Sequence, residues 1–211
     1  MDFTDDFDCR LENILKIKSN FYDEACILIF VYLDYLCGFT EKKYDDNYHN
    51  KENFRHFLMM YSGKEDILKY IQIDQINALF DSSVTDSERY GHYLDKYQSQ
   101  FKEIQEGTNL PITDFLSLDD VHDSDKGFFQ KYTLANRLYD LRNRAVHEYR
   151  NNVYLQLDSN LPVVIFIHNI DKEKQGWYSI LFSFEFLYEI LMNCYEKVNK
   201  EYNDFIVKHF P

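Results

Sequence analysis

An arginine and a histidine five positions apart, Arg142 and His147, are the residues of this sequence best suited to chemistry. A guanidinium can bind a phosphodiester through two parallel hydrogen bonds and stabilise charge that develops in a transition state. A histidine titrates near neutrality and can move a proton between a 2′-hydroxyl and a leaving oxygen. Asn143 lies four residues before His147, so on a helix its amide can support the imidazole. These residue types favour phosphodiester cleavage by proton transfer, a reaction that needs no metal ion.

The residues around this pair predict a helix that begins after Asp125 and ends near Tyr149. Its apolar positions fall within one narrow arc, which we expect to face the core: Leu134, Leu138, Leu141 and Ala145. The positions expected on the opposite side are Asn136, Tyr139, Asp140, Asn143 and His147.

Arg142 and His147 lie roughly 140° apart around the axis of such a helix. A single straight helix should therefore not point both side chains at the same phosphate. Either the helix ends or distorts near His147, or two copies of the helix meet across a twofold axis. The second solution places two arginines and two histidines in one cleft and predicts a homodimer.

Charge is distributed unevenly along the chain. The formal net charge is −13, and a chain this acidic should repel nucleic acid at long range. Residues 126–150 nevertheless carry a net charge of +4, so the remainder carries −17. Within this segment Arg137 and Arg144 could attract RNA or form salt bridges with the acidic remainder. The pattern indicates one anion-binding segment on an otherwise acidic protein.

Apolar spacing elsewhere predicts an all-α, or mainly α, fold. Residues 10–37 indicate one long helix or two abutting helices, with Gly38 placed to end them. Two or three short helices are expected between 53 and 81, and an amphipathic helix at 86–106. We expect a bundle of five to seven helices in a single domain covering residues 1–211.

The strongest β signal predicts one β-hairpin inserted near 152–167. Two apolar-rich runs, 152–157 and 161–167, are joined there by an Asp-Ser-Asn turn. A last helix is expected from Ser179 towards Lys208, because apolar residues recur there at heptad-like spacing. Its first half carries a second apolar face, which would pack into the core or against a partner subunit: Phe182, Phe186 and Ile190.

The run Leu141–Tyr149, LRNRAVHEY, resembles the R-x4-6-H signature of the HEPN superfamily, in which a polar residue follows the arginine. It also resembles the R-x4-H-x-Y form of HEPN toxins that pair with minimal nucleotidyltransferase antitoxins. A helical bundle with the motif on a late helix, followed by a long apolar helix, is similar to the family plan. The resemblance implies a homodimer whose motifs meet at the interface and a metal-independent endoribonuclease that leaves a 2′,3′-cyclic phosphate.

By this likeness Arg142 and His147 would be catalytic and Asn143 supporting, and Tyr149 matches the tyrosine that the antitoxins modify with AMP. RNA, a second copy and a nucleotidyltransferase-like antitoxin or other regulatory protein are the expected partners, and no cofactor is expected. The chain is longer than a minimal HEPN domain and carries the hairpin as an insertion. These departures leave the subfamily and the RNA substrate open.

Two interpretations of another class compete with a nuclease. The chain could be a catalytically inactive HEPN-like module that binds nucleotides or RNA, or that only dimerises. It could also be a helical interaction protein in which the spacing of Arg142 and His147 is accidental. Asp34, which ends an apolar run, suggests a buried carboxylate of functional interest, a residue in a wet groove, or a partner for an arginine.

Composition limits the remaining possibilities. Hydrophobic residues make up 45% of the chain, which excludes an intrinsically disordered protein. The longest apolar run, Ala25–Leu33, is shorter than a bilayer-spanning helix. The four cysteines show no CxxC pairing, so we expect a reducing cytoplasm and no structural zinc site.

Overall fold

In a computed structural model, the protein is described at residues 3–41, 50–95, 97, 109–148, 155–156, 163–168 and 177–209. The chain divides into two compact units, each built from separate stretches of sequence. Unit 1 comprises Met1–Glu65, Leu138–Asn152 and Phe184–Pro211, and unit 2 comprises Asp66–Arg137 and Val153–Ser183. The single domain expected for residues 1–211 stays a prediction.

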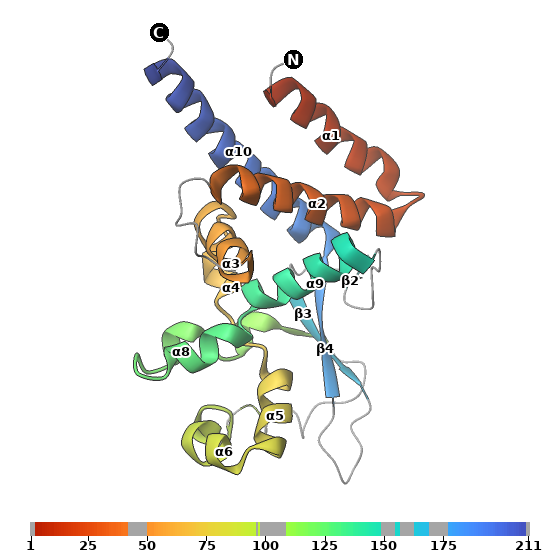
Figure 1. Ribbon diagram of the computed structural model, residues 1–211. Coiled ribbons are helices and arrows are strands. Elements are labelled where there is room, and N and C mark those ends of the chain that lie inside the picture. Colours follow the sequence, from red (N-terminus) through yellow and green to blue (C-terminus); the bar gives the residue numbers. More distant parts are fainter. Residues whose placement is uncertain are drawn as a thin grey trace. The chain divides into compact units, whose positions relative to one another are not determined.

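Unit 1 is helical. Its elements are α1 (Phe3–Lys18), α2 (Tyr22–Glu41), α3 (Asn50–Tyr61), most of α9 (Leu134–Glu148) and α10 (Phe184–His209). Helix α2 contacts α1, α3 and α10, so it lies at the centre of the unit (Figure 1). The Phe7 ring of α1 stacks on the Tyr195 ring of α10, with 4.5 Å between centroids.

The core of unit 1 comes from the apolar positions that the sequence pattern marks. Fully buried side chains line α2 and α10: Ile29, Leu33, Leu36, Leu187, Ile190, Leu191 and Cys194. Burial raises the pKa of the Cys194 thiol, which keeps it protonated. Phe186 is 2% exposed, so both apolar faces of α10 are covered within the chain. The expected second face therefore packs in the core and gives no support to a dimer contact there.

Unit 2 combines short helices with a small sheet. Its helical elements include most of α4 (Glu65–Leu68), α5 (Ile73–Ser82), α6 (Val84–Tyr90), η1 (Gly91–Tyr93), η2 (Ile112–Asp114), η3 (Leu118–Asp120), α8 (Lys126–Phe129) and η4 (Gln130–Tyr132). The strands are β1 (Asn109–Pro111), β2 (Leu155–Gln156), β3 (Val163–His168) and β4 (Trp177–Ser183). They form one sheet in the order β1-β3-β4-β2.

The mainly helical fold is confirmed, and β2 and β3 lie in or beside the segment near 152–167 where the hairpin is expected, but β1 and β4 lie outside it and the pairing differs from a hairpin. Strand β3 pairs antiparallel with β4, with Val163 opposite Phe182. Strand β2 pairs in parallel with β4 and not with β3. The expected last helix begins at Phe184 rather than Ser179, because Trp177–Ser183 is a strand.

Three helix boundaries also differ from expectation. Residues 10–37 form two helices, the second of the two arrangements considered, and α2 continues past Gly38 to Glu41. The helix expected after Asp125 is interrupted at Thr133, whose backbone is extended and whose hydroxyl donates to the carbonyl of Gln130. The expected helix at 86–106 is interrupted, since α6 ends at Tyr90 and a 3₁₀ turn follows it; Asp95 and Tyr97 are again helical, and residues 98–106 lie outside the described part of the chain.

No helix among the described residues is long and apolar enough to cross a membrane.

Candidate functional site

The expected core arc of α9 is confirmed by burial. Leu134, Leu138 and Ala145 are at most 2% exposed, and Leu141 is 6% exposed. Because this stripe faces the core, the helix is fixed in rotation about its axis, and the directions of its polar residues follow from it. The C-terminal part of α9, from Leu138 onward, belongs to unit 1.

Arg142 and His147 come together within a single copy of the chain. The Nη1 atom of Arg142 lies 3.5 Å from Nε2 of His147 and donates to Oδ1 of Asn143 at 2.7 Å. The long arginine side chain spans the angle that separates the two positions on the helix. The geometric reason for a site composed of two copies is therefore removed, although a homodimer itself stays a prediction.

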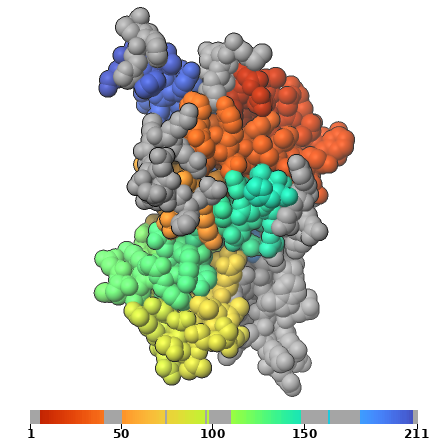
Figure 2. Space-filling model, viewed as in Figure 1, coloured from red at the N-terminus to blue at the C-terminus, as the bar shows by residue number. Residues whose placement is uncertain are grey.

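Asp34 of α2 supplies the second contact of the guanidinium. Its Oδ1 accepts a hydrogen bond from Nη2 of Arg142, and the two groups form an ion pair. The surface of α9, in turquoise, lies beside the red-orange surface of α2 in Figure 2. Of the roles considered for Asp34, the structure shows the partner of an arginine.

Arg142 is buried. Its side chain is 11% exposed, against 36% for Asp34. The rings of Phe54 and Tyr139 lie 6.0 and 5.7 Å from its guanidinium carbon, measured to their centroids. A buried cation is costly without a counter-charge, so the carboxylate of Asp34 explains how Arg142 is accommodated.

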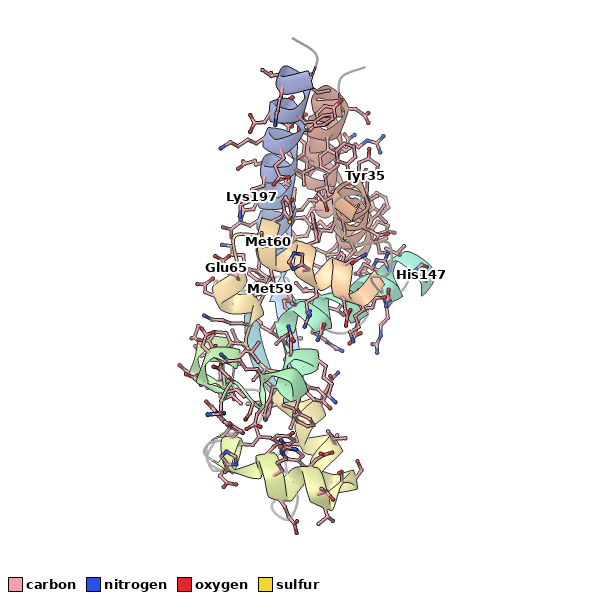
Figure 3. The ribbon with its side chains drawn as sticks, turned by 60° about the vertical axis from the view of Figure 1, so that its left-hand side comes forward. Tyr35, Met59, Met60, Glu65, His147 and Lys197 are labelled. Carbon is pink, nitrogen blue, oxygen red and sulfur yellow. The ribbon has the colours of Figure 1, made fainter. Side chains whose placement is uncertain are left out.

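His147 is exposed and lies in the last turn of α9, as Figure 3 shows. Arg142 can donate a hydrogen bond to Nε2 only when that nitrogen carries no proton. The arrangement presents an exposed imidazole beside a guanidinium that Asp34 and Asn143 hold.

Of the other residues expected at the site, only some lie near Arg142 and His147. Asn143 contacts Arg142 rather than the imidazole among the described contacts, and Arg144 is half-exposed. Tyr149 lies outside the described residues. Asn136 is 4% exposed and donates to the carbonyl of Gln130 at 2.7 Å. Its expected place opposite the core is therefore wrong.

Arg137 is also buried, at 6% exposure. Because it is buried, Arg137 is not accessible to RNA at the surface, and its side chain packs in the interior instead. Of the two arginines considered for that role, only Arg144 remains accessible to a ligand.

Lys51 of α3 is a cation that the sequence did not single out. Its Nζ lies 3.7 Å from a carboxylate oxygen of Asp140 and 5.8 Å from the centroid of the Tyr139 ring. The Tyr139 ring also lies near Arg142, so the lysine and the arginine flank the same aromatic side chain. No local pattern marks Lys51, because its neighbours on α9 are distant in sequence.

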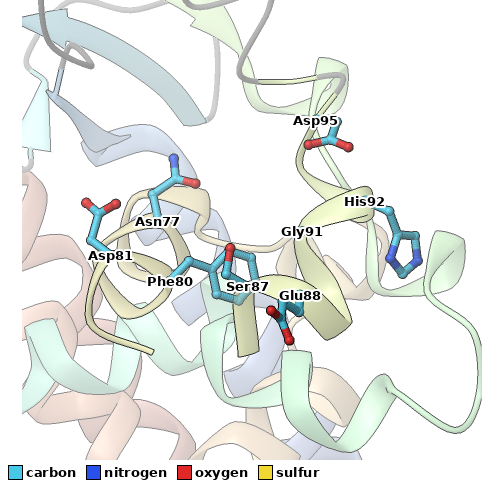
Figure 4. Close-up of a pocket in the computed structure, with 8 residues that line it drawn as sticks. All are labelled: Asn77, Phe80, Asp81, Ser87, Glu88, Gly91, His92 and Asp95. Atoms are coloured by element: carbon cyan, nitrogen blue, oxygen red, sulfur yellow. The ribbon is translucent and has the colours of Figure 1, made fainter. Parts of the chain in front are cut away.

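Unit 2 contains a different hollow, with a cavity volume of about 500 Å³ (Figure 4). Its lining comes from α5, α6 and the turn that follows: Asn77, Phe80, Asp81, Ser87, Glu88, Gly91, His92 and Asp95. The carboxylates would repel a phosphate, so this cavity does not suit an RNA backbone. No cluster of three or more His, Cys, Asp or Glu side chains with the geometry of a metal site occurs among the described residues.

No protein-family model, curated protein or solved structure matches this chain. The likeness to HEPN domains therefore rests on the run Leu141–Tyr149 and the helical plan.

Proposed function

We propose that this chain is a metal-independent endoribonuclease in which His147 transfers protons and Arg142 binds the phosphate. The observation that supports this best is the distance of 3.5 Å between Nη1 of Arg142 and Nε2 of His147. At this distance a guanidinium, which can bind a phosphate, lies beside an imidazole, which can transfer a proton. Exposure of His147 leaves the imidazole open to a large substrate.

The proposed reaction is an internal transesterification of RNA. The imidazole takes the proton from a 2′-hydroxyl, and the 2′-oxygen attacks the adjacent phosphorus. The bond from phosphorus to the 5′-oxygen breaks, and the imidazolium of His147 gives its proton to the leaving oxygen. The products are a 2′,3′-cyclic phosphate and a free 5′-hydroxyl. Arg142 stabilises the additional negative charge on the phosphoryl oxygens in the transition state.

The test is cleavage of a mixed-sequence RNA in the presence of EDTA, with end-group analysis of the products. We expect cyclic phosphate ends from the wild-type chain and none from His147→Ala. DNA of the same sequence should not be cut, because it lacks the 2′-hydroxyl. Cleavage that EDTA stops but His147→Ala does not would exclude this mechanism.

The burial of Arg142 favours a second candidate, a catalytically inactive HEPN-like module that binds RNA or nucleotides, or that only dimerises. Both Nη atoms of Arg142 already contact protein groups, Asp34 and Asn143. An arginine held in this way can serve the stability of α9 and α2 alone. Retained RNA binding or dimerisation by a wild-type chain that cuts no RNA would support this candidate.

We further propose, from the HEPN resemblance, a homodimer and a role as a toxin or antiviral-defence effector in the cytoplasm. Sedimentation at micromolar concentration tests the dimer. Incubation with a nucleotidyltransferase-like antitoxin and ATP tests modification of Tyr149, which mass spectrometry would detect as added AMP. A monomer that cuts RNA would separate the proposed chemistry from the proposed assembly.

A further inference from the structure

We infer that Asp34 is a positioning residue, which acts by holding the guanidinium of Arg142 against the imidazole of His147. The inference rests on the proposed function, since it concerns the same site. No part of the R-x4-H run contains this residue, because Asp34 lies on α2, 108 residues before Arg142.

The contacts of Arg142 show what Asp34 contributes. An arginine side chain has several rotatable bonds and considerable rotamer entropy, so one hydrogen bond does not fix its orientation. Asn143 holds Nη1, and Asp34 holds Nη2. Two anchors on different nitrogens define the plane of the guanidinium and leave Nη1 directed towards His147. Nε is buried and has no hydrogen-bond partner among the described residues, so it adds no third anchor.

The surroundings of Asp34 indicate that its carboxylate is present for Arg142. Leu33 and Leu36, its neighbours on α2, are fully buried. The only ion pair of Asp34 among the described residues is the one with Arg142. Loss of the carboxylate would leave a guanidinium that is 11% exposed without its counter-charge. Such a group moves towards water, and that movement would take Nη1 away from the imidazole.

Asp140 provides a matched control. Its side chain is 37% exposed, close to the 36% of Asp34, and it also forms an ion pair, with Lys51. Asp140 lies on α9 itself and is not paired with Arg142. Asp140→Asn therefore removes the same charge at the same exposure and leaves the guanidinium anchored.

The kinetic test is a double-mutant cycle. We expect Asp34→Asn to lower kcat about tenfold to a hundredfold through misplacement of Arg142, and Asp140→Asn to leave kcat unchanged. In a chain that already carries Arg142→Gln, Asp34→Asn should lower kcat no further, because Asp34 acts through the arginine. Asp34→Glu should restore part of the loss. An equal loss in both backgrounds, or faster cleavage by Asp34→Asn, would overturn the inference; faster cleavage would mean that Asp34 competes with the phosphate.

A second readout does not depend on activity. The NMR signals of the His147 ring should shift in Asp34→Asn at constant pH and stay in place in Asp140→Asn, because only the first change releases the guanidinium of Arg142 from its place beside the imidazole. If the wild-type chain cuts no RNA but the ring signals respond in this way, the proposed function fails and the positioning of Arg142 by Asp34 stands. If the chain cuts RNA and neither kcat nor the ring signals respond to Asp34→Asn, the inference fails and the proposed function stands.

Discussion

The Arg142 site of unit 1 and the cavity of unit 2 present opposite chemistry. The first joins a buried guanidinium to an exposed imidazole and lies near the ammonium group of Lys51. The second is a hollow of about 500 Å³ lined by three carboxylates, those of Asp81, Glu88 and Asp95, with His92 as its only titratable base. The cavity of unit 2 is therefore the less suitable place for a phosphate. The comparison teaches that charge and donor geometry, rather than volume, identify the candidate site on an acidic protein.

The largest expected difference between the two regions concerns their histidines. His147→Ala should slow RNA cleavage by about a hundred- to ten-thousand-fold, because proton transfer is lost. His92→Ala should leave the rate unchanged, since His92 lines the acidic cavity and is likewise exposed. The measurement is the single-turnover cleavage rate of a labelled RNA. Equal loss in both variants would remove the distinction between the regions.

The next largest expected difference between the two regions is in their contribution to the stability of the fold. Arg142→Ala should lower the free energy of unfolding by about 2 kcal/mol, less than the cost of breaking a fully buried pair because Asp34 is partly solvated. Glu88→Gln, on the exposed rim of the cavity, should change it by less than about 0.5 kcal/mol. Urea unfolding monitored by circular dichroism measures both values. A neutral Arg142→Ala would mean that the guanidinium is not held as described.

The dependence of RNA affinity on salt should sharpen the comparison further. The basic segment is short, so the slope of log affinity against log salt should correspond to roughly two to four ion contacts. Arg144→Gln should reduce that slope by about one contact, and Asp81→Asn should leave it unchanged. Fluorescence anisotropy at several salt concentrations gives the slopes. A steep slope would place the binding surface elsewhere.

The smallest expected effect is a change in the rate of association with RNA when the carboxylates of the cavity are neutralised. Neutralisation of all three, in the variant Asp81→Asn/Glu88→Gln/Asp95→Asn, weakens the long-range repulsion of RNA. The association rate should rise at low salt by less than about tenfold and should match the wild-type rate at high salt. Stopped-flow mixing measures it. An effect that persists at high salt would show that the cavity contacts RNA directly.

The sequence predicted the helices well, because burial of one face imposes a period that local spacing reveals. The core arc of α9 and the apolar stripe of α10 are buried as expected. The strand β4 was missed because Ile180 also fits the helical series that continues into α10. Ile180 and Phe182 are buried and Leu181 between them is half-buried, but this period of two is hidden in the sequence because all three residues are apolar.

The site was predictable in composition but not in arrangement. The type and spacing of Arg142 and His147 identified them, and both lie together in the structure. The helical wheel gives only the direction in which a side chain leaves the axis, and it ignores the reach of an arginine. It therefore overstated the separation of the two groups. The pairing of Arg142 with Asp34 joins distant parts of the chain, and no local pattern contains it.

The separation of Asp34 from Arg142 also bears on how the protein is made. Asp34 leaves the ribosome 108 residues ahead of its partner, and α2 can pack on α10 only after α10, which ends at His209, has followed. During synthesis the site is therefore incomplete until most of the chain has emerged. If the site cleaves RNA as proposed, this order of emergence delays activity on the ribosome that is still translating the protein.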